Sequence, residues 1–210
     1  MAFLFGFILL LILMAVVGAF FYTGFLVYKR LPLLYFLLLL FALVATPYLV
    51  FKSYEKDFLL SIVPDALKVK SISYRAEESW GFGPGGNEAG IRIYPLSEQV
   101  ASEISQRGIE FFNNLPPNQD QQSREWRGRY ENWSETPIRA NQRWKWNLQT
   151  AQLDIYDYIG AYGFFLDIKP EVVAQANEIV NSAGSYYAYG RIGLIVVSPS
   201  KKLVLYLYNG

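Results

Sequence analysis

Histidine and cysteine are both absent from this chain of 210 residues. Without imidazole or thiol side chains there is no Ser-His-Asp triad, no cysteine nucleophile, no disulfide, and no conventional zinc, haem or iron–sulfur site. Any catalysis would have to use carboxylate, Lys, Tyr or Ser side chains. We therefore expect no metal ion, no cofactor and no catalytic residue, and favour a binding protein over an enzyme.

Charge is scarce in the first quarter of the chain. Only Lys29 and Arg30, of 37 charged side chains, precede Lys52. The runs Ala2 to Tyr28 and Leu31 to Phe51 contain 27 and 21 uncharged residues. As helices they would reach roughly 40 and 31 Å, against about 30 Å for the hydrocarbon core of a bilayer. We expect residues 1–51 to form a transmembrane helical hairpin, with spans at about 2–28 and 31–51, that binds the lipid bilayer through residues 2–51.

The basic residues near the two spans favour one orientation. Lys29 and Arg30 lie in the short turn, and no Lys or Arg precedes the first span. Because short basic loops stay in the cytoplasm, the turn is expected inside and the following domain outside. In a bacterium this would be an inner-membrane protein with a periplasmic domain. Lys52, Lys56 and Lys68 follow the second span, so a cytoplasmic domain stays open.

Residues 52–210 have the charge content of one soluble domain, with 17 basic and 18 acidic side chains. This balance gives no broad field for phosphate groups, so we expect no nucleic-acid partner. Strand and helix patterns alternate irregularly with hairpin-length links. The sequence therefore predicts an α+β fold, in which the transmembrane hairpin precedes a domain with a largely antiparallel sheet and two or more helices.

Local patterns predict the individual elements of this domain. Strand patterns cover residues 67–74, 91–96 and 153–159, helices begin at Ser97 and Pro170, and a hairpin pairs residues 186–197 with 203–208. Within the second apolar run, Pro47 predicts a kink or an end of the helix near Thr46. Four identities at an offset of 73 residues suggest a repeated strand-strand-helix unit, with chance as the alternative.

The segment from about 113 to 147 is a Trp/Arg-rich insertion that holds four of the five tryptophans. Tryptophan and arginine dominate binding hot spots, and tryptophan also stacks on sugars and anchors at bilayer interfaces. In the alternative, the indole rings fill the core and the arginines form ion pairs. The partner-binding candidates are Trp126, Arg127, Arg129, Trp133, Arg143, Trp144 and Trp146.

A glycine-rich stretch runs from Trp80 to Gly90. It lacks the Lys-Ser/Thr ending of a phosphate-binding P-loop and leads into a strand, so we expect a hairpin loop with a polar tip. The loop-tip binding candidates are Trp80, Gly83, Gly86, Asn87 and Glu88.

Carboxylate pairs are the one credible route to catalysis here. Glu77 with Glu78, or Asp154 with Asp157 and Asp167, would have to meet in space as a glycosidase-like acid and nucleophile. Adjacent residues of a strand point to opposite faces, which argues against the first pair. Surface solvation accounts for all five side chains.

These patterns together predict a membrane-anchored, non-catalytic domain that binds a protein partner at the bacterial cell envelope. It would be a subunit of an envelope complex or a tethered inhibitor that neutralises a toxin. The alternative is a protein that binds envelope glycan, or hydrolyses it with carboxylates.

Overall fold

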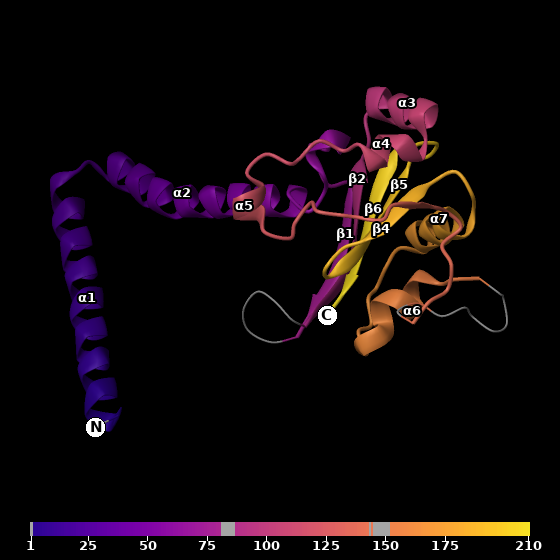
Figure 1. The fold of residues 1–210 in the computed structure, drawn as a ribbon. Coiled ribbons are helices and arrows are strands. Elements are labelled where there is room, and N and C mark those ends of the chain that lie inside the picture. Colours follow the sequence, from indigo (N-terminus) through magenta and orange to yellow (C-terminus); the bar gives the residue numbers. More distant parts are fainter. Residues whose placement is uncertain (1, 81–86, 143, 145–151) are drawn as a thin grey trace. The chain divides into compact units, whose positions relative to one another are not determined.

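The computed structural model describes residues 2–80, 87–142, 144 and 152–210. The chain divides into two compact units, Met1–Glu55 and Lys56–Gly210. The first unit holds two long apolar helices, α1 (Ala2–Arg30) and most of α2 (Leu33–Leu60). The second unit is an α+β domain (Figure 1).

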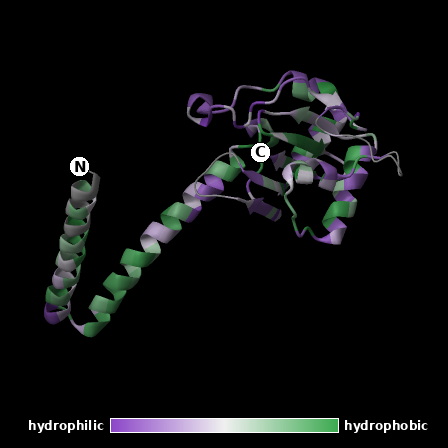
Figure 2. Ribbon diagram, turned by 90° about the horizontal axis from the view of Figure 1, so that it is seen from below, coloured by the Kyte–Doolittle hydropathy of each residue, from purple (hydrophilic) through white to green (hydrophobic). Residues whose placement is uncertain are grey.

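Helices α1 and α2 are long and apolar enough to cross a membrane, by length and composition. Figure 2 shows apolar residues along both helices, with polar residues gathered at their turn and toward the end of α2. Pro32 lies just before α2, where its missing N–H costs nothing, and its carbonyl accepts from the Phe36 N–H at 3.1 Å.

One of the two outcomes expected from Pro47, an end of the helix near Thr46, is wrong for α2. The helix continues through Pro47 to Leu60. Proline removes one backbone hydrogen bond, but the leucine-rich sequence that precedes it favours the helix. The residues from Lys52 to Leu60, which follow the second apolar run, therefore belong to the same helix.

The domain is built on one antiparallel sheet of six strands, which confirms the predicted α+β class with a largely antiparallel sheet (Figure 1). Their order is β1-β2-β6-β5-β4-β3, so β6 lies in the interior of the sheet and β1 and β3 form its edges. The strands are β1 (Tyr74–Ser79), β2 (Glu88–Pro95), β3 (Ser134–Glu135), β4 (Tyr186–Tyr189), β5 (Gly193–Ser198) and β6 (Leu203–Asn209).

Helices and loops cover both faces of this sheet. Alternate residues of a strand point to opposite faces, so Ile91 and Leu205 lie in one core cluster while Tyr94 and Tyr206 lie in the other. The first cluster includes residues of α6 and α7, and the second includes residues of α3, α4 and η1. The helical elements are η1 (Asp65–Leu67), α3 (Glu98–Arg107), α4 (Ile109–Asn113), α5 (Gln121–Arg124), α6 (Ile155–Ile159), η2 (Gly160–Tyr162) and α7 (Pro170–Asn181).

Several predicted elements are confirmed by their capping chemistry. The Ser97 hydroxyl accepts from the Val100 N–H at 3.3 Å and caps α3. Pro170 is the first residue of α7. The predicted strand 186–197 is two strands, because a turn at residues 190–192 separates β4 from β5.

The predictions for 67–74 and 153–159 were wrong. In the first stretch Leu67 is the last residue of a 3-10 turn, Lys68 has a left-handed backbone conformation, and the strand begins only at Tyr74. The second forms α6, because the Asp154 carboxylate accepts from the Tyr156 N–H at 3.0 Å and Asn177 accepts from the Ile155 N–H at 2.9 Å. With no strand there, the apparent strand-strand-helix repeat is not present in the fold.

Candidate functional site

Two of the predicted partner-binding residues, Trp133 and Trp144, lie in the core. Trp133 is 8% exposed and stacks on Phe112 with ring centroids 4.3 Å apart. Trp144 is 1% exposed, and its indole N–H donates to the Asp154 carbonyl at 2.9 Å. Each ring fills the core on one face of the sheet, so the core alternative applies to both. Arg143 and Trp146 lie outside the described residues.

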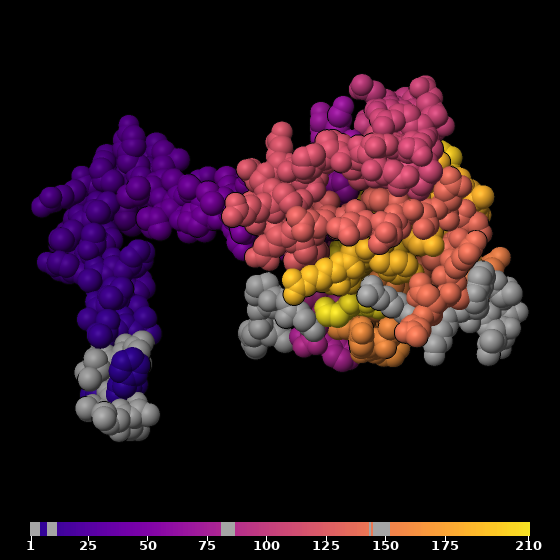
Figure 3. Space-filling view, in the orientation of Figure 1, coloured from indigo at the N-terminus to yellow at the C-terminus, as the bar shows by residue number. Residues whose placement is uncertain are grey.

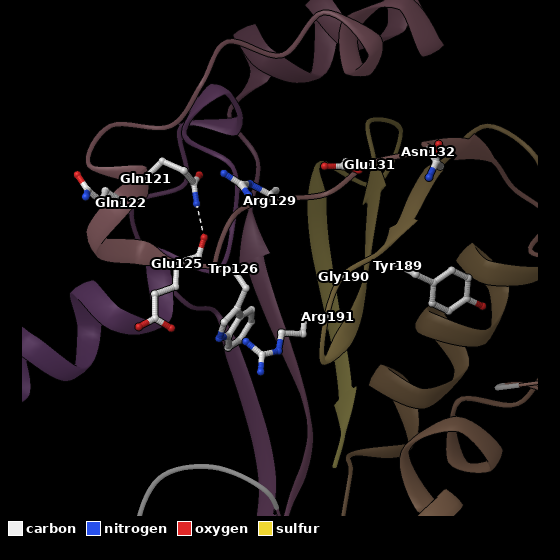
Figure 4. A pocket seen from close by; sticks show the side chains of 10 residues that line it. All are labelled: Gln121, Gln122, Glu125, Trp126, Arg129, Glu131, Asn132, Tyr189, Gly190 and Arg191. Atoms are coloured by element: carbon white, nitrogen blue, oxygen red, sulfur yellow. Dashed lines mark hydrogen bonds between the residues drawn. The ribbon is translucent and has the colours of Figure 1, made fainter.

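Trp126 and Arg129, by contrast, line a groove of about 610 Å³ on the surface of the domain (Figure 4). One wall comes from the insertion, from α5 to Asn132, and the other from the end of β4 and the turn that follows it. Figure 4 shows the Trp126 indole beside the Arg191 side chain. The groove is lined by Gln121, Gln122, Glu125, Trp126, Arg129, Glu131, Asn132, Tyr189, Gly190 and Arg191.

The insertion wall is held in shape by Asn118. Its amide group donates to the Gly128 carbonyl at 2.8 Å and to the Gln121 side chain at 2.7 Å, and its oxygen accepts from the Asp65 N–H at 2.8 Å. Gln121 in turn donates to the Glu125 carbonyl at 2.7 Å. Because a single amide fixes both ends of the loop, Trp126 projects from a defined backbone.

Tyr130 joins the two walls. Its hydroxyl donates to the Ile62 carbonyl at 3.0 Å, and burial of that hydroxyl raises the Tyr130 pKa well above 10. Its ring packs against Gly190, where an added Cβ would lie 2.8 Å from a ring carbon. The close approach of ring and turn requires glycine at this position.

The groove carries exposed charges of both signs, on Arg129, Arg191, Glu125 and Glu131. In the part of the chain that the structure describes, none of these four side chains has an oppositely charged group within ion-pair distance. Their charges are therefore not neutralised by these neighbours. The groove thus presents two exposed guanidinium groups, each able to bind a carboxylate through two hydrogen bonds.

Arg127 serves the fold of the insertion. Its guanidinium donates to the carbonyls of Arg124 at 3.0 Å and Ser123 at 2.9 Å, and it lies 4.6 Å from the centre of the Phe58 ring. It does not line the groove.

The glycine-rich stretch joins β1 to β2, which confirms the predicted hairpin. Trp80 is 52% exposed, and it is held in place because its ring lies 5.0 Å from that of Phe164 and its indole N–H donates to Glu78 at 3.0 Å. Asn87 is exposed and its carbonyl accepts from the Trp80 N–H at 2.9 Å. Glu88 begins β2. Gly83 and Gly86 lie outside the described residues.

Glu77 belongs to a charged cluster that the sequence did not reveal. Its carboxylate accepts from Arg92 at 3.1 Å and from the Tyr208 hydroxyl at 2.8 Å, and it also pairs with Arg75. Partial burial by itself would raise the Glu77 pKa, but the hydrogen bonds from Arg75, Tyr208 and Arg92 outweigh it and lower the pKa from 4.5 to about 2.

The neighbouring carboxylate, Glu78, accepts from the Trp80 indole N–H and from the Phe165 N–H at 2.8 Å. Glu77 and Glu78 therefore bind different partners. Asp154 is used as the cap of α6. Among the described residues there is no group of three or more acidic side chains that could hold a metal ion.

The groove beside Trp126 is therefore the place where the described structure best combines an aromatic ring with unneutralised charge. Comparison with known proteins gives no further guide, since no family model, no curated protein and no solved structure matches this chain.

Proposed function

We propose that this chain is a membrane-anchored, non-catalytic protein-interaction domain that binds its partner in the groove beside Trp126. In this proposal α1 and α2 form the anchor, the Lys29-Arg30 turn lies in the cytoplasm, and the domain faces the periplasm of a bacterial envelope. The groove, which Trp126, Arg129 and Arg191 all line, is the observation that carries the proposal.

Partner recognition would combine apolar and charged contacts. A half-buried indole gives a rigid contact surface, and tryptophan and arginine are enriched among residues that dominate binding energy. Arg129 and Arg191 would take a carboxylate of the partner, while Glu125 and Glu131 would repel a purely acidic surface. The groove therefore fits a protein segment that carries an acidic side chain next to an apolar one.

A photo-cross-linking residue in place of Gln122, on the groove, tests this in the cells that make the protein. We expect one protein adduct, reduced about tenfold by Trp126→Ala or Arg191→Ala, as for loss of a hot-spot contact. The same residue in place of exposed Gln106 on α3 is the matched control. An adduct equally strong at both positions, or unaffected by the two substitutions, would contradict the proposal.

Glycan binding is the second candidate function, because the amide side chains of Gln122 and Asn132 lie in the same groove as the indole. Indole faces stack on sugars, and amides bind their hydroxyl groups. Solubilised cell-wall glycan fragments would then change tryptophan fluorescence of the native chain but not of Trp126→Phe. No change with the native chain removes this candidate.

A further inference from the structure

The two edges of the sheet differ in length and protection. At one edge, β3 has two residues and is followed closely by Pro137, which has no N–H to donate. At the other edge, β1 has six residues. Among the described residues, no backbone hydrogen bond from another segment reaches the N–H and C=O groups of Glu77 and Ser79 on its outer side. A six-residue strand at the edge of a sheet is a template for a further strand.

The hydrogen-bond pattern shows which groups of β1 face outward. The Trp80 N–H donates to the Asn87 carbonyl at 2.9 Å, and β1 continues antiparallel to β2 from there. Since paired and unpaired residues alternate along an antiparallel strand, even-numbered residues of β1 bond toward β2. The N–H and C=O groups of Glu77 and Ser79 therefore point away from the sheet.

A groove of about 790 Å³ runs beside this edge. It lies between β1 and the segment from Phe165 to Pro170, which is tied to β1 by hydrogen bonds from the Phe165 N–H to Glu78 at 2.8 Å and from the Lys169 N–H to the Tyr74 hydroxyl at 3.1 Å. Phe165 is 89% exposed. The edge thus has an uncovered apolar ring beside it.

We propose that the occupant of this edge is β1 of a second copy of the same chain, paired antiparallel about a two-fold axis at Ala76. Outward-facing residues must meet outward-facing residues, so Arg75 lies opposite Glu77 of the second copy, and Glu77 opposite its Arg75. Two opposite-charge pairs flank a small residue on the axis. The two six-stranded sheets become one continuous sheet.

The charges of β1 select this register over its neighbours. Sliding the strands to the next hydrogen-bonded register in either direction places Glu77 against Glu77 or Arg75 against Arg75 on the axis, and directly opposed like charges are destabilising. In the proposed register Tyr74 lies opposite Glu78 of the second copy. Lys169, whose backbone N–H donates to the Tyr74 hydroxyl, therefore lies near that carboxylate. The edge is self-complementary in one alignment.

Cross-linking of the full chain in detergent tests the proposal, since the sequence has no native cysteine to interfere. In the proposed register the two copies of Ala76 form a non-hydrogen-bonded pair with Cα atoms about 4.5 Å apart, which suits a disulfide. Ser79, exposed on the same strand, would lie about 20 Å from its own copy. Under mild oxidation we expect Ala76→Cys to give about tenfold more covalent dimer than Ser79→Cys.

Charge variants then test the register. Combined with Ala76→Cys, Arg75→Glu should abolish most of the dimer and Arg75→Ala should reduce it less, with an unchanged circular dichroism spectrum. Equal dimer yields at positions 76 and 79, or a yield indifferent to Arg75→Glu, would overturn the proposal. So would an Ala76→Cys adduct formed only with a different protein. The result is independent of whether the Trp126 groove binds a partner.

Discussion

At the scale of single residues, Arg92 is the least expected feature of the domain. It lies on β2, is 5% exposed, and its guanidinium carbon is 4.4 Å from the centre of the Tyr208 ring. Burial by itself would lower the Arg92 pKa, but the neighbouring Tyr208, Tyr94 and Glu77 groups raise it. A buried cation needs its partners in place, because removing one leaves uncompensated charge.

The Glu77 carboxylate makes stability depend on acid pH. Its pKa is about 2 in the folded chain against 4.5 ordinarily, so its contribution is present above pH 4.5 and is lost as the pH falls toward 2. Glu77→Gln should lower the free energy of unfolding by about 1–3 kcal/mol at pH 7 and by much less near pH 2. Urea titrations at both pH values measure the difference, with Glu103→Gln, in the exposed pair with Arg107, as control. An equal loss at both pH values would contradict the ionic explanation.

Gly190 tests the contact that joins the walls of the groove. In Gly190→Ala the new methyl group would overlap the Tyr130 ring, so we expect destabilisation by about 1–3 kcal/mol, as for overpacking, and weaker partner capture. Gly160→Ala is the control, because nothing lies within 4 Å of the Cβ it adds. Thermal unfolding that shifts equally in both variants would show that the close approach is not the cause.

At the scale of elements, the insertion from about 113 to 147 is shaped by side-chain hydrogen bonds to the backbone. Its described part contains one four-residue helix, α5, and a two-residue strand. The guanidinium of Arg124, on α5, forms an ion pair with the Asp65 carboxylate at 2.6 Å, and this pair connects the insertion to η1. In Figure 3 the insertion extends over the front of the domain. Polar contacts of this kind leave no periodic signal in a sequence.

Asn118→Ala should loosen this whole element. It removes the hydrogen bonds that hold Asp65, Gln121 and Gly128, so we expect a loss of about 1–3 kcal/mol and faster amide exchange from residue 118 to 128. Asn114→Ala is the matched control, since exposed Asn114 bonds only to Glu110 among the described residues. Exchange that is unchanged from native in Asn118→Ala would show that the loop does not depend on this amide.

Elements that have a clear capping residue, or a regular pattern of apolar and turn-forming residues, were predicted from the sequence. Elements without such a local pattern were not. The strand around Ile91 and the β5–β6 hairpin follow from β-branched and apolar residues between turn formers. Residues 153–159 contain the same residue types, yet they form α6 because Asn177 and Asp154 hold its first N–H groups. Asn177 lies on α7, so no local pattern could reveal this partner.

At the scale of the whole molecule, the proposed topology makes a labelling prediction. With a periplasmic domain, Ser200→Cys in the exposed β5–β6 turn should react with a membrane-impermeant maleimide in spheroplasts. Leu31→Cys, in the turn between the two spans, should react only after permeabilisation. The reverse pattern would place the domain in the cytoplasm, and labelling of both positions in intact spheroplasts would contradict the hairpin.

The sequence by itself determined the two apolar helices, the absence of imidazole and thiol chemistry, the α+β class and the C-terminal hairpin. Each depends on composition or on a short repeat along the chain. Only the tertiary structure decided which tryptophans are accessible, since Trp126 and Trp133 both have polar neighbours in the sequence, but Trp133 stacks on Phe112 while Trp126 lines the groove. It alone also joined Glu77 to Arg92 and Tyr208 and left β1 at an edge, because strand order and cross-strand contacts depend on residues far apart in the chain.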